Sequence, residues 1–156
     1  MSKPAATPTP HDPQFAQRVR DSFARQAVME LLGARLEAVG PGHVTIAMAH
    51  RPELCQQHGF LHAGIVSTAL DSACGYAAFS LMPPDAAVLT IEFKVNLLAP
   101  ARGPDFQYEA RVTKAGRTIS VVDGQAWQIA AGGDRTCIAT MTATVMTVRG
   151  REGLKH

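Results

Sequence analysis

The feature that most constrains the fold is a long apolar stretch with a single charge. Residues 64–82 are small or apolar apart from a few hydroxyls, and Asp71 is the only charged residue among them. A stretch of about 20 residues could cross a bilayer, but this one is rich in Ala, Ser and Gly, and a carboxylate at mid-span costs roughly 2.5–3.5 kcal/mol. We therefore predict no membrane span, and instead a buried helix over about 63–81, ended by Pro83 and Pro84.

A helix that is apolar on all sides must be covered on all sides. Strands are predicted on both sides of it in the sequence, because apolar and polar residues alternate and turn residues separate the segments. The expected fold class is α+β, with an antiparallel sheet wrapped around the long central helix. The predicted strands are 34–40, 43–50, 87–98, 105–116, 117–131 and 136–148.

A further helix is predicted ahead of the sheet, over residues 13–32. Asp12 and Pro13 have the residue types of an N-cap and a first-turn proline. Apolar residues then recur at helical spacing, and Gly33 follows as a stop signal.

Composition limits the number of domains and the class of partner. The 156 residues are 46% hydrophobic and 18% charged, which fits one globular domain. We predict a flexible tail at 1–12, a single domain at 13–150 and a flexible end at 151–156. The net charge is +2 with scattered basic residues, which argues against nucleic-acid binding. Three distant cysteines without a C-x-x-C pair, and no apolar signal region, favour a cytoplasmic protein.

Asp71 is the candidate catalytic residue. Its helical neighbours at three, four and seven residues are all small, so one flank of the helix is flat and suited to the close approach of a backbone or a substrate. A buried carboxylate must be paired, protonated or functional. The structural alternative is a carboxylate near the surface or bonded to Ser67 or Thr68. The small neighbours are Gly64, Ser67, Thr68, Cys74, Gly75 and Ala78.

The segment HGFLHAG at 58–64 leads into the helix. Its small residues let a ligand approach the free backbone N–H groups of the first turn, which form an oxyanion hole. Asp71 lies roughly 10 Å from Gly64 at about 1.5 Å per residue. One chain therefore has difficulty aiming both groups at one carbonyl. We predict a two-fold homodimer in which antiparallel helices build composite sites.

Metal and thiol chemistry are the competing interpretations. His58 and His62 are spaced i, i+4 with Cys55 nearby, but no acidic third ligand falls at regular spacing, so no metal site is predicted. Cys74 has no basic neighbour on the helix and is predicted to be a core thiol.

Taken together, these motifs resemble the hotdog-fold acyl-CoA thioesterases of the PaaI-like type. The resemblance covers about residues 30–148 and rests on QQHGFLHAG, on Asp71 in STALDSACGYAA, on LTIEFKVNLLAPA and on the AGR turn. It implies a hotdog fold and hydrolysis of an acyl-CoA thioester to a free acid and CoA. It also implies no metal or prosthetic group, and homodimers that assemble into homotetramers.

The resemblance further implies roles for single residues. Asp71 matches the general base or nucleophile, and Ala63 and Gly64 match the pair whose N–H groups polarise the thioester carbonyl. Gln56 matches an amide that orients the attacking water or holds the carboxylate, although the adjacent Gln57 could take that place. Ala63 replaces a glycine of the family motif, so a positive φ there would be strained. The other matches are His62 of the motif, Thr90 near the attacking water, and the CoA-groove positions Asn96, Pro100 and Arg117.

Two other functions stay open on the sequence: an acyl-CoA-binding module without hydrolysis, and hydration of enoyl thioesters. Asp71 and Gln56 argue against the first, and the lack of the corresponding Asp/His motif argues against the second. The sequence does not identify the acyl group. Candidate walls of its pocket are Phe60, Leu61, Tyr76, Phe79 and Met82.

Overall fold

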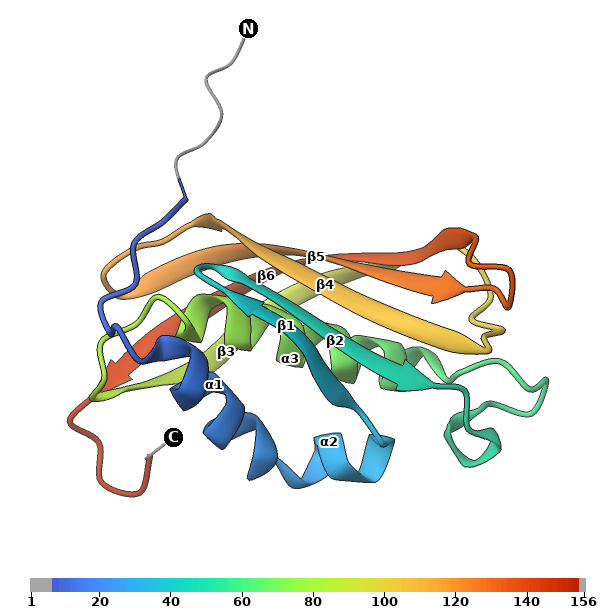
Figure 1. The fold of residues 1–156 in the computed structure, drawn as a ribbon, viewed down its shortest axis with the longest axis horizontal. Coiled ribbons are helices and arrows are strands. Elements are labelled where there is room, and N and C mark those ends of the chain that lie inside the picture. Colours follow the sequence, from blue (N-terminus) through green and yellow to red (C-terminus); the bar gives the residue numbers. More distant parts are fainter. Residues whose placement is uncertain (1–6, 155–156) are drawn as a thin grey trace, which may run out of the picture.

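The computed structural model describes residues 7–154 and contains a six-stranded antiparallel sheet that curls around one long helix (Figure 1). The strand order is β1-β2-β4-β5-β6-β3, which is the α+β architecture that the sequence predicts. Helix α3 runs lengthwise along the sheet, and α1 lies beside β1. The elements are α1 (Phe15–Ala24), α2 (Ala27–Leu32), β1 (Arg35–Gly40), β2 (His43–Ala49), a 3-10 turn (Pro52–Leu54), α3 (Ala63–Phe79), β3 (Ala86–Leu97), β4 (Asp105–Lys114), β5 (Ile119–Ile129) and β6 (Arg135–Arg149).

Helix α3 is buried on every side only in its second half. From Ser72 to Phe79 every residue is buried, whereas Ser67, Thr68 and Asp71 stay partly open. Strand β5 comes close to the buried half at Gly124, where an added Cβ would lie 2.9 Å from the Cys74 Sγ. The small flank predicted along the whole helix is therefore open only in the first half, because Cys74 packs against the sheet of its own chain.

The predicted helix over 13–32 is two helices. Gln26 is extended, with φ −82° and ψ 97°, and caps α2, so the chain bends between Ala24 and Ala27. Gly33 ends α2 in the left-handed region, at φ 64°, as its position predicts. The residues around Gln26 are good helix formers, so tertiary contacts rather than local preference make the break.

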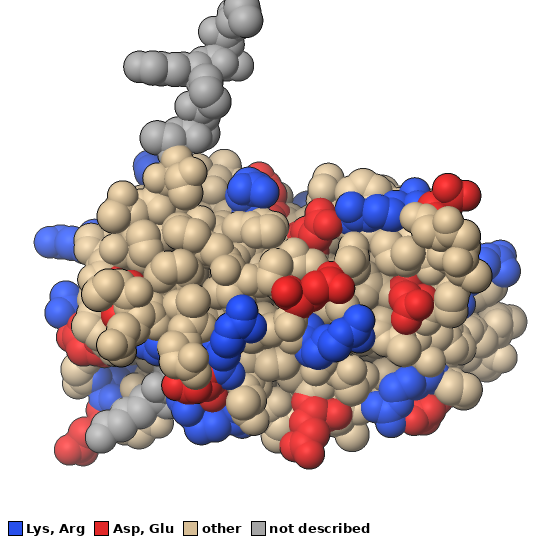
Figure 2. Space-filling view, viewed as in Figure 1, with Lys and Arg blue, Asp and Glu red and all other residues tan. Residues whose placement is uncertain are grey.

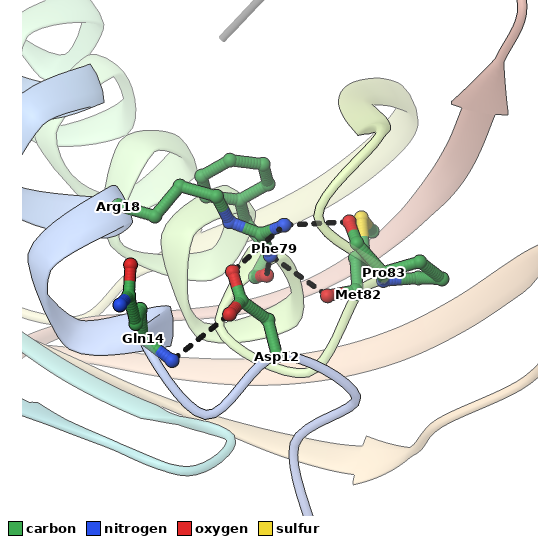
Figure 3. A network of polar contacts seen from close by, with 6 residues as sticks. All are labelled: Asp12, Gln14, Arg18, Phe79, Met82 and Pro83. Carbon is green, nitrogen blue, oxygen red and sulfur yellow. Dashed lines mark hydrogen bonds and ion pairs between the residues drawn. The ribbon is translucent and has the colours of Figure 1, made fainter.

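Arg18 of α1 binds the C-terminal end of α3 (Figure 3). Its guanidinium donates hydrogen bonds to the main-chain oxygens of Phe79, Met82 and Pro83, at 3.0, 2.7 and 2.6 Å. It also pairs with Asp12 at 3.4 Å, and Asp12 accepts from the Gln14 N–H ahead of α1. Burial lowers the pKa of Arg18, against the opposing effect of Asp12. Arg18, a largely buried cation, therefore holds the N-terminal helices against the end of the central helix.

The predicted tails are only partly described. Residues 1–6 and 155–156 lie outside the described range, and the domain boundaries stay a prediction. Within the described part of the first tail, Asp12 is buried and the His11 N–H donates to the carbonyl oxygen of Leu81. Residues next to the start of α1 thus contact the end of α3.

Strand β3 is one edge of the sheet and pairs only with β6 among the described strands. A bulge at Ile91 shifts its register between Thr90 and Glu92. The edge exposes large apolar side chains: Ile91 is 52% exposed, Phe93 41% and Leu97 54%. A long apolar edge with unpaired main-chain groups is a surface on which another strand can pair.

On the face drawn in Figure 2, acidic and basic side chains are interspersed, so this face has no large patch of one charge sign. Among the described helices, none is long and apolar enough to span a membrane.

Candidate active site

The start of α3 is capped by the imidazole of His62. The His62 Nδ1 accepts the Gly64 N–H at 2.9 Å, and an added Cβ at Gly64 would lie 3.1 Å from that nitrogen. Residues Ile65 and Val66 donate to the His62 carbonyl oxygen. Within residues 7–154 no acceptor is found for the Ala63 N–H. Of the predicted pair of N–H donors, Gly64 is therefore bonded internally and Ala63 is the one open to a ligand.

Ala63 occupies its position without strain. It is the first residue of α3, and no non-glycine residue of the described chain has a positive φ. The replacement of the family's glycine by Ala63 thus keeps a helical backbone and an available N–H.

A groove of about 530 Å³ opens at this helix start. Its lining is mostly apolar and includes the predicted site residues Gln56, His62, Ala63 and Pro100. Gln57 lines it as well, so both glutamines border the groove. The Gln56 side-chain oxygen accepts the His58 N–H, which holds the loop ahead of α3. At the rim, the Arg102 guanidinium lies over the Phe60 ring, 4.6 Å from its centroid.

Asp71 lies in a different pocket. Its carboxylate accepts a hydrogen bond from the Thr90 hydroxyl of β3 at 2.8 Å. Burial raises the pKa of Asp71, and the bond from Thr90 opposes that rise. The pocket beside it is small, about 100 Å³, and includes Gln26, Tyr76 and Val88. Asp71 is thus a half-buried carboxylate with a hydroxyl partner, an environment in which a carboxylate can accept a proton.

The predicted site residues therefore fall into separate groups in one chain. Asp71 lies eight residues beyond Ala63 on a straight helix, which is about 12 Å along the axis. Arg117 lies farther away, in a cavity that also contains Ala78 and Met82 at the end of α3. Figure 1 shows the two ends of α3 at opposite ends of the molecule.

Asn96 lies on the outer face of the sheet. It pairs with Thr140 of β6 and donates to the Thr140 hydroxyl at 3.2 Å. The flanking β6 residues Ala139 and Met141 are buried on the inner face, so residues paired with Thr140 point outward. The structure does not bring Asn96 to the helix start.

The competing chemistries gain no support from the geometry. The described residues hold no group of three or more His, Cys, Asp or Glu side chains placed to bind a metal. Cys74 is fully buried, and burial raises its pKa to about 12, so it is the core thiol that the sequence predicts. Cys55 contacts His50, at 3.2 Å from Sγ to Nε2, rather than His58 or His62.

Sequence reasoning missed Gln26, which reaches the Asp71 pocket from the junction of α1 and α2. It also missed the apolar exposure of β3. The alternation of β3 indicates a strand, but strand order is needed to identify it as an edge. For Gln26 the sequence gives no such signal, because a polar residue within a helical pattern is usually a solvent-exposed position.

Comparisons with known proteins agree with this geometry. Residues 58–132 match the sequence model of the thioesterase superfamily. The crystal structure of a thioesterase family protein from Silicibacter pomeroyi is 59% identical, with a TM-score of 0.85 over 87% of this chain and 99% of that one. The esterase-like protein PA1618 of Pseudomonas aeruginosa is 30% identical over 83% of this chain and 88% of its own.

The fold likeness extends to distant proteins. The PaaI protein of the E. coli phenylacetic acid degradation operon is 17% identical, with a TM-score of 0.78 over 88% of this chain and 95% of that one. The fold and the sequence matches agree. This chain belongs to the thioesterase superfamily and is a thioester hydrolase with the PaaI-like hotdog fold.

Proposed function

We propose that this chain hydrolyses acyl-CoA thioesters to a free acid and CoA, at sites that two copies of the chain build together. The observation that carries the proposal is the separation of the half-buried Asp71 from the open N–H of Ala63 by about 12 Å of rigid helix. Neither group alone can both polarise a carbonyl and activate water. Both can act on one carbonyl if they come from different chains.

The exposed edge supports such a pair. Strand β3 lies beside the open half of α3, since Thr90 bonds to Asp71. Two copies joined edge to edge along β3 would cover Ile91, Phe93 and Leu97 and would set their open α3 halves antiparallel. In that arrangement each helix start faces the Asp71 of the other copy.

The chemistry then needs only water. The Ala63 N–H of one copy binds the carbonyl oxygen as it becomes negative. Asp71 of the second copy takes a proton from a water, whose oxygen attacks the carbonyl carbon. The C–S bond breaks, the CoA sulfur leaves with its electron pair and is protonated, and the acid is released. No metal or prosthetic group has a step in this route.

The groove at the helix start suits the long arm of CoA. It is apolar and open, and Arg102 at its rim offers a cation for phosphate. Arg117 of the same chain is at the far end of α3, but antiparallel helices would bring the second copy's Arg117 beyond the first copy's helix start. In this arrangement Pro100 of one copy and Arg117 of the other serve one CoA molecule. Asn96 has no part in it.

The test is thiol release from a panel of acyl-CoAs, comparing the wild type with Asp71→Asn. Loss of a general base is expected to lower kcat/KM by about 10²–10⁴-fold. Asp123→Asn is the matched control, because that carboxylate accepts from Thr113 and Thr142 away from the site. The acyl-CoA assignment fails if the wild type releases no thiol from any chain length. The role of Asp71 fails if Asp71→Asn keeps full activity.

One further measurement separates the two roles of Asp71. If Asp71 attacked the carbonyl itself, a mixed anhydride would form, and its hydrolysis in ¹⁸O water under single turnover would leave the label in the carboxylate. The half-buried position and the Thr90 bond favour the base role, for which no label is expected in Asp71.

A further inference from the structure

The inference that follows rests on the proposed function and concerns the acyl group. The bend between α1 and α2 places an amide beside the catalytic carboxylate. Gln26 is fixed at its backbone, since its N–H donates to Phe23 and its carbonyl accepts from Met29. Its side-chain oxygen accepts the Ser72 hydroxyl of α3 at 3.4 Å. Ser72 is the next residue after Asp71, so this contact joins the N-terminal helices to the turn of α3 that carries the carboxylate.

The pocket beside Asp71 is formed by α3, β3 and the junction of α1 and α2. Its lining includes Gln26, Asp71, Gly75, Tyr76, Val88 and Thr90. The Tyr76 wall is held from behind, where its hydroxyl bonds to Ser22 at 3.2 Å and its ring contacts Phe23 with centroids 5.8 Å apart. These contacts hold the Tyr76 side chain in place. The pocket cannot extend beyond Tyr76 unless α1 moves.

In the proposed pair of chains, the groove of one copy and the Asp71 pocket of the other flank the reacting carbonyl, and the two cavities differ in size. The groove at the helix start has about 530 Å³ and is open, whereas the pocket beside Asp71 has about 100 Å³. A thioester has two arms, and the CoA arm is long and must exit to solvent. Only the larger groove accommodates it. The acyl group is then left with the small pocket.

We propose that Gln26 and the Asp71 pocket select the acyl group, and that the preferred substrates carry a compact acyl chain. A cavity of roughly 150 Å³ holds one benzene molecule, so this pocket of about 100 Å³ fits about three or four carbon atoms. Gln26 lines the pocket, and in this proposal its side chain limits the chain length. Within the described residues its side-chain nitrogen has no acceptor, so it can donate to an oxygen carried by the acyl chain.

The experiment measures kcat/KM for straight-chain acyl-CoAs from acetyl to decanoyl. The wild type is expected to favour the shortest members, with at least a tenfold lower value for the octanoyl and decanoyl substrates. Gln26→Ala removes the end wall and should raise the octanoyl value relative to the butyryl value by tenfold or more. Gln26→Phe fills the pocket and should depress the butyryl value while it spares acetyl.

Controls keep the result interpretable. Gln17→Ala removes an exposed amide from the same helices, bonded to Asp21, and should leave the chain-length profile unchanged. Val88→Ala enlarges the same pocket from β3 and serves if the Gln26 variants fold poorly. If the Gln26 and Val88 variants hydrolyse acyl-CoAs with the same chain-length profile as the wild type, this inference is overturned and the proposed function still stands. A wild type that prefers long chains would also overturn it, and no hydrolysis at all would overturn both.

Discussion

At the scale of single residues, the proposed base is controlled by one hydroxyl. Burial raises the pKa of Asp71 and the hydrogen bond from Thr90 lowers it. Thr90→Val removes the opposing effect and keeps the side-chain shape, so the pKa of Asp71 rises further. Because the base acts when deprotonated, the acidic limb of the kcat/KM profile should move to higher pH. The profile is measured with one acyl-CoA substrate across the range in which the protein stays folded.

Thr113→Val is the matched control for that shift. Its hydroxyl also bonds to an aspartate, Asp123, but on strands β4 and β5. The acidic limb should stay in place in this variant. An acidic limb that does not move in Thr90→Val would show that Thr90 does not govern the protonation of the base.

Asp71 and Thr90 could be predicted from the sequence, whereas the position of Asn96 could not. A lone carboxylate in an apolar helix is conspicuous because its burial needs a reason. In a regular strand Thr90 and Asn96 would share a face, since they are an even number of residues apart. The bulge at Ile91 adds one residue and turns Asn96 to the outer face. Nothing in the apolar pattern of β3 marks where a bulge falls.

At the scale of elements, Arg18 joins the N-terminal helices to α3. Arg18→Met keeps the length of the side chain but leaves Asp12 and the carbonyls of Phe79, Met82 and Pro83 without their donor. Removing one partner of a buried ion pair costs about 3–5 kcal/mol, and the partial exposure of this pair favours the lower end. Urea unfolding followed by circular dichroism measures the loss in free energy of unfolding.

Arg20→Met is the control, because Arg20 lies on the same helix and is exposed. Its effect on the free energy of unfolding should stay within about 0.5 kcal/mol. Equal losses of unfolding free energy in the two variants would mean that the effect comes from removing any arginine of α1, and not from the contacts that Arg18 makes.

The long elements follow from sequence pattern, and the bend in the N-terminal segment does not. Helix α3 and the six strands were predicted within a few residues of their bounds, because burial dictates their periodicity. Residues 24–27 have helical preference throughout, and the extended backbone of Gln26 coincides with the contact of its side chain with Ser72 of α3. Contacts between distant segments decide such a feature, and local sequence does not record them.

At the scale of the whole molecule, the composite site predicts complementation between two inactive variants. Ala63→Pro deletes the open N–H yet suits the first position of a helix, and the extended His62 before it accommodates a following proline. Alone, it should lose about 10²–10³-fold in kcat. Mixed with Asp71→Asn after unfolding and refolding together, half of the dimers carry one intact site, so about a quarter of wild-type activity should return.

The measurement is thiol release from the refolded mixture, with each variant refolded alone as its control. Light scattering on the same samples gives the mass and distinguishes a dimer from a tetramer. A mixture no more active than its components would mean that each chain completes its own site. The pairing of chains was inferred from the distance between two groups on one helix, and no residue pattern distinguishes a dimer from the tetramer that two dimers would form.

The exposed edge of β3 also affects the risk of aggregation while the chain is being synthesised. Under the proposed pairing of copies, a newly made single copy presents a twelve-residue strand whose outer edge has no partner strand among the described residues, with Ile91, Phe93 and Leu97 exposed. Such an edge pairs with any extended apolar segment nearby, including those of unfinished chains. Encounter with a second copy therefore competes with aggregation. Slower expression should therefore increase the soluble fraction of the chain, provided that its concentration stays high enough for two copies to pair.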